Sequence, residues 1–190
     1  MKVLSIKQPF ATLICANIKL IENRTWKCPE KYIGKRILIH ASAKSWTWDA
    51  VVEYLFNTAY YLLSMFGFNA EWLSKLNTSA IIGSVIIADC VQNHPSIWAE
   101  KGVWNWVIKD PILFEKPVLN VKGKLGFWDY EIENLSSAGL VELNCQVCGK
   151  EYMGKEPQMC CSGRECGCMG LPIDPIVCSK ECYDKLTNKP

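Results

Sequence analysis

Residues 5–28 read SIKQPFATLICANIKLIENRTWKC, and this stretch sets charged and aromatic side chains within a mostly apolar segment. The apolar start of the chain, residues 1–6, predicts a strand that leads into it. Pro9 suits the first turn of a helix, and apolar residues at helical spacing extend that helix to Asn17. Two cations, a carboxylate and a tryptophan follow closely, which indicates a candidate binding site beside the predicted helix.

The rest of the first 130 residues alternates predicted strands with predicted helices. β-Branched runs at residues 36–41 (RILIHA) and 80–88 (AIIGSVIIA) are typical of buried strands. Apolar residues three and four apart predict an amphipathic helix over residues 47–66 and a short one over residues 69–76. Three later strands are predicted at residues 103–108, 112–114 and 118–121. Asp110-Pro111 and Pro117 separate them, because proline disrupts the hydrogen bonding of a strand. This order predicts a small β-barrel of the α+β class with interrupting helices.

Positive charge is concentrated near the N-terminus. The formal net charge is only +2, but residues 1–44 hold nine Lys/Arg against two acidic residues, and residues 45–134 hold six against ten. Such a field suits a phosphate-bearing ligand better than a membrane, and the alternative is a solvated face. The sequence shows no secretory signal and no apolar run near the roughly 20 residues that span a bilayer, so we expect a cytoplasmic protein.

Cysteine dominates the end of the chain, where eight of the eleven cysteines lie. Cys145-x-x-Cys148, followed by Gly149, has the form of a zinc knuckle. Cys178 and Cys182 are four residues apart, so a helix that begins there would turn both thiolates to one side. Together these four cysteines predict a tetrahedral structural zinc site of treble-clef or zinc-ribbon type. The metal would supply folding free energy that so small an apolar core cannot.

The composition changes over residues 135–143, which predicts a linker between a first domain (residues 1–134) and a cysteine-rich, zinc-binding domain (residues 144–190). Four further cysteines in the second domain can form a second metal site, share ligands with the first, or act as redox pairs. They are Cys160, Cys161, Cys166 and Cys168.

Four motifs occur in order along the first domain: Lys-Gln-Pro at residues 7–9, Lys-x-x-Glu-x-Arg at residues 19–24, GKRILIH at residues 34–40 and GKLGFW at residues 123–128. In combination they resemble the ASCH domain family, which is related to the PUA RNA-binding barrels. The resemblance implies a PUA-like β-barrel with a cleft, and RNA, DNA or a nucleotide-like molecule as ligand, with RNA favoured over DNA. A protein partner of the cysteine-rich tail is a further expectation.

Nine residues are candidates for ligand binding: Lys7, Gln8, Lys19, Glu22, Arg24, Trp26, His40, Ser42 and Lys124. Lys19 and Arg24 can hold phosphate, and Trp26 can stack on a base. Gln8 can read a base edge, while Glu22 can orient the cations. The alternatives are structural: Gln8 as a helix cap, Glu22 and Arg24 as an ion pair that holds the barrel, and Trp26 as core.

An enzymatic interpretation also follows from the resemblance. Small ASCH-like bacterial proteins include amidohydrolases that act on acetylated cytidine through a lysine, a threonine and a glutamate. Lys19 matches the lysine, but the position of the threonine, three residues on, holds Glu22. A carboxylate replaces a nucleophilic hydroxyl poorly, which favours binding over catalysis. The alternatives are acid–base chemistry by Lys19 and Glu22 on a modified nucleoside or RNA, and a zinc-stabilised protein-interaction module with the barrel as scaffold.

Overall fold

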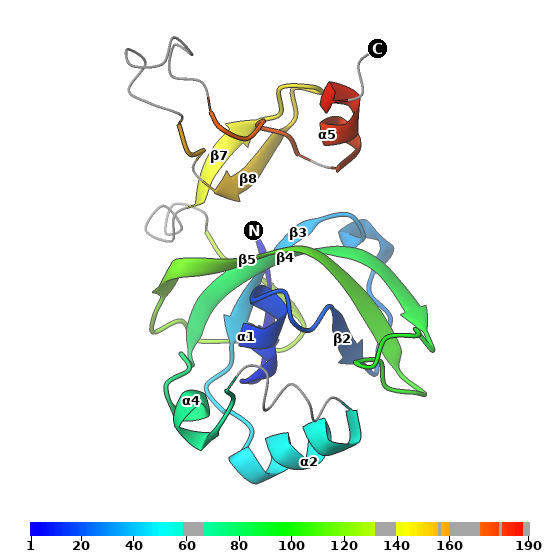
Figure 1. Cartoon of the computed structure of the whole chain (residues 1–190), viewed down its shortest axis with the longest axis vertical. Helices are drawn as coiled ribbons and strands as arrows, with labels where there is room; N and C mark the ends of the chain where they lie inside the picture. Colours follow the sequence, from blue (N-terminus) through cyan, green and yellow to red (C-terminus); the bar gives the residue numbers. More distant parts are fainter. Residues whose placement is uncertain (59–66, 132–139, 156, 160–171, 179, 188–190) are drawn as a thin grey trace. The chain divides into compact units, whose positions relative to one another are not determined.

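The structure, a computed structural model, describes residues 1–58, 67–131, 140–155, 157–159, 172–178 and 180–187 (Figure 1). The chain divides into two compact units, residues 1–134 and residues 135–190. None of the described helices is long and apolar enough to cross a membrane.

The first unit is built on one mixed sheet of six strands in the order β2-β5-β4-β3-β1-β6. The strand bounds are β1 Lys2–Ile6, β2 Ile21–Arg24, β3 Arg36–Ala41, β4 Ala80–Gln92, β5 Trp104–Val118 and β6 Phe127–Asp129. β1 runs parallel to β3, and the other neighbouring pairs are antiparallel. Helices interrupt the strand order, so the unit is of the α+β class that the sequence predicts.

The sheet curls because its two longest strands, β4 and β5, are bent by bulges. Their pairing shifts register at residues 81–83, 84–86 and 87–89 of β4. Each bulge bends the strand and adds twist. Figure 1 shows β4 and β5 arching over helix α1, so that the curled sheet forms half of a barrel.

Helix α1 (Phe10–Cys15) fills the concave side of this sheet, and five of its six residues are buried. Gly83 of β4 is what allows so close an approach. A Cβ added at Gly83 would lie 2.3 Å from the carbonyl oxygen of Ile112 and 2.6 Å from Sγ of Cys15. The remaining helical elements described in this unit are η1 Glu30–Tyr32, α2 Trp48–Thr58 and α4 Ala70–Ser74.

β5 is one strand of fifteen residues, so the strand break predicted at Asp110-Pro111 is wrong. These two residues fall between Lys109 and Ile112, which pair on either side of a register shift, and Asp110 has a φ of +45°. The proline therefore lies in a bulge, where the ladder does not require its missing N–H.

Other elements differ from prediction at their ends. The first helix is shorter than residues 9–17, and the predicted strand over residues 118–121 contributes only its first residue to β5. The described part of the helix predicted over residues 47–66 is α2, and residues 59–66 lie outside the described part of the chain. β2 is not predicted by the sequence, since half of its four residues are charged.

In the second unit, β7 (Leu140–Asn144) and β8 (Glu151–Lys155) form an antiparallel hairpin, and helix α5 covers Lys180–Thr187. β7 begins inside the stretch 135–143 expected as a linker, because residues 140–143 pair with residues 152–155 of β8.

Candidate functional site

A pocket of about 390 Å³ opens in the first unit between β1, α1, β2 and α2. We call it the Lys19 pocket. Its charged lining consists of Lys7, Lys19, Glu22, Arg24 and Glu100. Its volume lies within the range usual for small-molecule sites.

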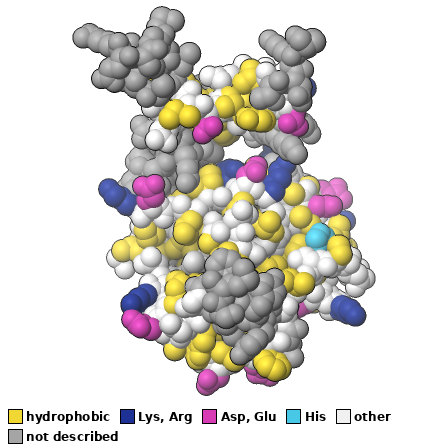
Figure 2. Space-filling view, in the orientation of Figure 1, with side chains coloured by type: hydrophobic (Ala, Val, Ile, Leu, Met, Phe, Trp, Pro, Cys, Tyr) yellow, Lys and Arg dark blue, Asp and Glu magenta, His cyan; other side chains and the backbone are white. Residues whose placement is uncertain are grey.

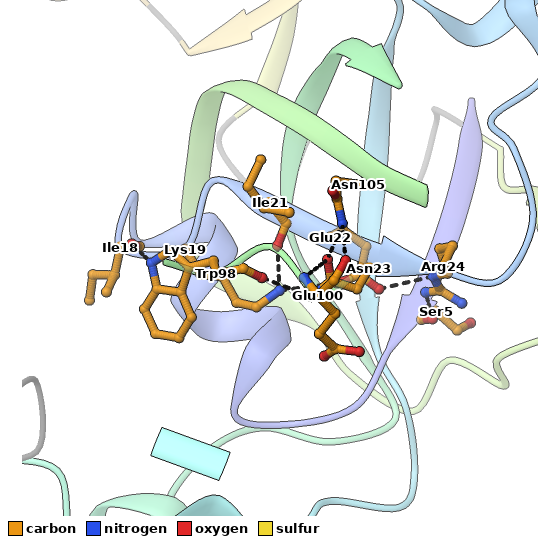
Figure 3. Close-up of polar contacts among 10 residues, drawn as sticks. All are labelled: Ser5, Ile18, Lys19, Ile21, Glu22, Asn23, Arg24, Trp98, Glu100 and Asn105. Atoms are coloured by element: carbon orange, nitrogen blue, oxygen red, sulfur yellow. Dashed lines mark hydrogen bonds and ion pairs between the residues drawn. The ribbon is translucent and has the colours of Figure 1, made fainter. Parts of the chain in front are cut away.

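Glu22 joins the two cations that the sequence singles out. Its Oε2 lies 3.7 Å from Nζ of Lys19, and its Oε1 lies 2.9 Å from Nε of Arg24 (Figure 3). Glu22 and Arg24 alternate along β2 and so project to the same side, while Lys19 comes from the turn that precedes the strand. Arg24 also donates a hydrogen bond of 2.9 Å to the carbonyl oxygen of Ser5. The prediction that these side chains form an ion pair is thus compatible with their lining a pocket.

Lys19 is the most deeply placed cation of this group, with 3% of its surface exposed. Its Nζ donates to the carbonyl oxygen of Ile21 and lies 5.5 Å from the centroid of the Phe10 ring. Burial lowers the pKa of Lys19, although the charges of Glu22 and Glu100 oppose that shift. A buried lysine with a lowered pKa, held by a specific carboxylate in a pocket, is a candidate functional group.

Three aromatic rings wall the pocket, and they are not the one that the sequence predicts. The Phe10 centroid lies 4.9 Å from that of Trp46 and 5.0 Å from that of Tyr54, in edge-on geometry. Trp46 is fixed by its backbone N–H, which donates to the Gln8 carbonyl oxygen over 2.9 Å. Burial, with the nearby Glu100 carboxylate, raises the pKa of the Tyr54 hydroxyl.

The sequence analysis also missed a hydrogen-bonded group of two asparagines, Asn23 and Asn105, that brings Glu100 to the pocket. Nδ2 of Asn105 donates to Oδ1 of Asn23 (2.9 Å) and to the carbonyl oxygen of Glu100 (3.0 Å). Nδ2 of Asn23 donates to the Trp98 carbonyl oxygen over 2.8 Å (Figure 3). The loop before β5 is thereby tied to β2. The sequence signal for this group is Asn105, a polar residue within the strand predicted over residues 103–108.

Two predicted ligand-binding residues have structural partners instead. Gln8 is fully buried, its Nε2 donates to the Asn77 carbonyl oxygen (2.8 Å), and its Oε1 accepts from the Thr12 N–H (3.1 Å). Trp26 does not line the pocket and packs edge-on against Trp106, with centroids 4.6 Å apart. These contacts favour the alternatives, a cap for Gln8 and core packing for Trp26.

His40, Ser42 and Lys124 line a second pocket of about 770 Å³, which we call the His40 pocket. His40 is 1% exposed, with Nε2 2.9 Å from the Val121 carbonyl oxygen and Nδ1 3.2 Å from Oγ of Ser5. Nε2 must carry a hydrogen in order to donate to that carbonyl. Ser42 lines both pockets, and the exposed Lys7 lines the Lys19 pocket. The structure thus divides the predicted residues between two adjacent cavities.

The buried His40 predicts a pH dependence of stability. Burial lowers the pKa of His40 below its usual value near 6.5, although the bond to Val121 opposes the shift. Below pH 6.5 the unfolded chain takes up a proton that the folded chain does not, so stability is expected to fall from pH 6.5 down to the lowered pKa. Urea unfolding at pH 7.5 and pH 5.5 should show a smaller loss for His40→Gln than for the wild type. Equal losses would contradict this assignment.

The excess of cations in residues 1–44 does not form a broad basic surface on the face shown in Figure 2, where lysine and arginine side chains lie among acidic ones. Besides Lys19, two of these lysines have carboxylate partners, Lys2 with Asp129 at 2.7 Å and Lys27 with Glu30 at 3.8 Å.

The second unit contains a cluster of four cysteines, Cys145, Cys148, Cys178 and Cys182, whose Sγ atoms all lie within 4.8 Å of one another. A tetrahedral zinc ion with Zn–S bonds of about 2.3 Å requires Sγ atoms about 3.8 Å apart. The Cys148–Cys178 and Cys178–Cys182 separations are 3.5 and 3.8 Å. The four cysteines can therefore hold a metal ion.

The electrostatics of this cluster suit a cation. Burial raises the pKa of the Cys145 thiol, but backbone hydrogen bonds from Cys148 and Cys178 outweigh burial and lower that pKa to about 6. Burial and the neighbouring thiols raise the pKa of Cys178 to about 12. Four thiolates so close together need a bound cation to remain deprotonated. The candidates for a second metal site, Cys160, Cys161, Cys166 and Cys168, lie outside the described residues.

A family model described as the ASCH domain matches residues 4–118. The crystal structure of ASCH from Zymomonas mobilis is 13% identical in sequence, with a TM-score of 0.44, and the match covers 72% of this chain and 91% of that one. A tyrosine-to-phenylalanine variant of the same protein matches at 15% identity and a TM-score of 0.42, over 71% of this chain and 93% of that one. No curated protein matches the chain.

Proposed function

Since the chain belongs to the ASCH domain family, whose members are generally associated with RNA, we propose that it binds single-stranded RNA and receives one nucleotide in the Lys19 pocket. The observation that carries this proposal is the pairing of two cations with one carboxylate inside an aromatic-walled cavity. Arg24 can offer its remaining N–H groups to a phosphate, and the exposed Lys7 adds charge at the rim.

The walls of the pocket suit the base and ribose of a nucleotide. The Phe10, Trp46 and Tyr54 rings supply apolar contact area. Glu22 and Glu100 can accept hydrogen bonds from an exocyclic amine, as carboxylates do from cytosine. A nucleotide needs both features, an apolar slot for the base and cations for the phosphate.

The proposal is tested by fluorescence anisotropy with labelled single-stranded RNA and DNA oligomers over a range of salt. The variant Lys19→Met, Glu22→Gln, Arg24→Met removes all three charges at nearly constant volume, so that no buried charge is left unpaired. We expect it to bind RNA at least about tenfold more weakly, with a salt slope lower by roughly 0.7 for each phosphate that the protein no longer neutralises.

The matched control is Lys75→Ala with Lys109→Ala, which removes two exposed lysines that line neither pocket. Lys7→Ala gives a second readout at the rim that involves no buried residue. Unchanged affinity and salt slope in both pocket variants would refute the proposal.

Catalysis on a modified nucleoside or RNA is the second candidate function, and the lowered pKa of the buried Lys19 beside Glu22 favours it. Two described hydrogen bonds favour binding instead, because they engage an amine and a hydroxyl of the pocket lining. Lys19 Nζ donates to the Ile21 carbonyl oxygen, and the Ser42 hydroxyl donates to the Lys44 carbonyl oxygen over 3.0 Å. Mass spectrometry of the protein incubated with the RNA oligomers and with acetylated cytidine separates binding from turnover.

For the second unit we propose a structural zinc ion held by Cys145, Cys148, Cys178 and Cys182. The Sγ separations and the low pKa of Cys145 support this choice. All-thiolate tetrahedral sites are typical of structural zinc, which contributes folding free energy and leaves no open position for chemistry.

A further inference from the structure

The Lys19 pocket and the His40 pocket are contiguous. Three residues line both of them: Ser5, Ser42 and Leu125. Their volumes of about 390 and 770 Å³ each fall within the range usual for a small-molecule site. A ligand with two linked parts can therefore occupy both and cross the shared rim.

Leu125 on this rim is 99% exposed, the most exposed of the large apolar side chains among the described residues. Its side chain packs against almost nothing in its own unit, so it contributes little to folding. Single exposed leucines are common, but this one lines two adjacent cavities, where it can contact a ligand that enters both.

The backbone that carries Leu125 is nevertheless fixed. Before it, the Val121 N–H donates to the Ser79 carbonyl oxygen over 2.8 Å, and His40 bonds the Val121 carbonyl oxygen. Next to it, the Ser5 hydroxyl donates to the Lys124 carbonyl oxygen over 3.0 Å.

Gly123 completes this attachment of the loop. A Cβ at Gly123 would lie 2.5 Å from Cε1 of His40, so only glycine lets the loop rest on the imidazole. The position of Leu125 is thus set by the barrel.

Cations lie in both pockets beside Leu125, and they outnumber the carboxylates Glu22 and Glu100. Lys122 and Lys124 line the His40 pocket, whose described lining contains no acidic residue. Lys7 lies on the rim of the other pocket. A phosphodiester that crosses the rim would therefore pass close to cations on both sides of Leu125.

From these observations we propose that Leu125 is a wedge that separates two successive bases of single-stranded RNA, one nucleotide entering the Lys19 pocket and the next the His40 pocket. Apolar side chains that unstack bases are an established device in nucleic-acid recognition. The ligand is then an unstacked dinucleotide unit rather than a free nucleoside. This inference rests on the proposed function and adds a second subsite to it.

The test uses the full chain, the four RNA homodinucleotides ApA, CpC, GpG and UpU, and the matching mononucleotides. The tightest-binding dinucleotide is then compared between the wild type, Leu125→Ala and Leu125→Met by calorimetric titration. We expect Leu125→Ala to bind the dinucleotide about tenfold more weakly, since the shortened side chain no longer packs against the bases. A mononucleotide meets only one face of Leu125, so its affinity should fall less than that of the dinucleotide. The salt slope should not change, since leucine carries no charge, and Leu125→Met should retain most of the dinucleotide affinity.

Circular dichroism supplies the readout of unstacking. The signal that arises from base–base stacking should collapse when the dinucleotide binds the wild type and persist when it binds Leu125→Ala at saturation. Leu119→Ala, another exposed leucine of the described residues, lines neither pocket and is the matched control.

The outcomes separate the two proposals. If the stacking signal persists in the wild-type complex, or if Leu125→Ala binds as the wild type does, the wedge is overturned while mononucleotide binding to the Lys19 pocket still stands. If no nucleotide binds the wild type, both the wedge and the proposed function are overturned.

Discussion

Replacing Glu22 with alanine is expected to lower the free energy of unfolding of the first unit by about 3–5 kcal/mol, because removing one partner of a buried ion pair leaves charge without compensation. Glu22 is 7% exposed and is the counterion of both Lys19 and Arg24. Urea unfolding followed by tryptophan fluorescence measures this, since all eight tryptophans lie within residues 1–134.

Two comparisons distinguish this effect from a general loss of charge. Glu71→Ala removes the partner of the exposed Lys75 and should cost less than about 1 kcal/mol. The Lys19→Met, Glu22→Gln, Arg24→Met variant should unfold close to the wild type, because it removes the buried charges together. If Glu22→Ala were no more damaging than Glu71→Ala, the three charges would not form one buried unit.

Loss of the proposed zinc ion is expected to unfold the second unit and leave the first one folded. Structural zinc sites of small peptides are worth about 10–16 kcal/mol at pH 7, more than so small an apolar core can replace. Purified protein should contain zinc, and a chelator should make residues 140–187 sensitive to trypsin at Lys150 and Lys185 while the tryptophan fluorescence stays unchanged.

Cys145→Ser should lose the metal, and Cys28→Ala, which changes a buried cysteine of the first unit, should keep it. A metal-free protein whose tail resists trypsin with and without chelator would exclude the site. Two metal ions per chain would assign the second to the remaining cysteines of the tail, Cys160, Cys161, Cys166 and Cys168.

The sequence predicts well those elements whose own run of apolar residues indicates burial. β3 and β4 are rich in isoleucine and valine. β3 has the predicted bounds, and β4 begins at the predicted residue but extends four residues beyond residue 88, to Gln92. β2 escapes prediction because Glu22 and Arg24 are typical of a surface loop, and they form a strand here only because β5 pairs with them. The strand break predicted at Pro111 is wrong because a bulge in the pairing of β5 with β4 accommodates the proline, and local sequence does not show that pairing.

The charged residues of the candidate site could be predicted from the sequence, but the aromatic residues that line the pocket could not. Lys19, Glu22 and Arg24 are near one another in sequence, so their meeting needs little more than one turn and one strand. Trp46 and Tyr54 reach Phe10 only through the tertiary fold, and nothing local distinguishes them from Trp26. The four cysteines could be recognised because their spacing in the sequence is typical of a tetrahedral metal site.

The pairing of β1 with β6 bears on how the chain emerges during synthesis. Val3 and Leu4 are almost fully buried and sit between β3 on one side and residues 127–129 on the other. A nascent chain can pair β1 with β3 early, but the other edge of β1 stays open until residues 127–129 have also left the ribosome. Until then an unpaired apolar edge faces the crowded surroundings of the ribosome, where chaperones would protect it from joining another chain.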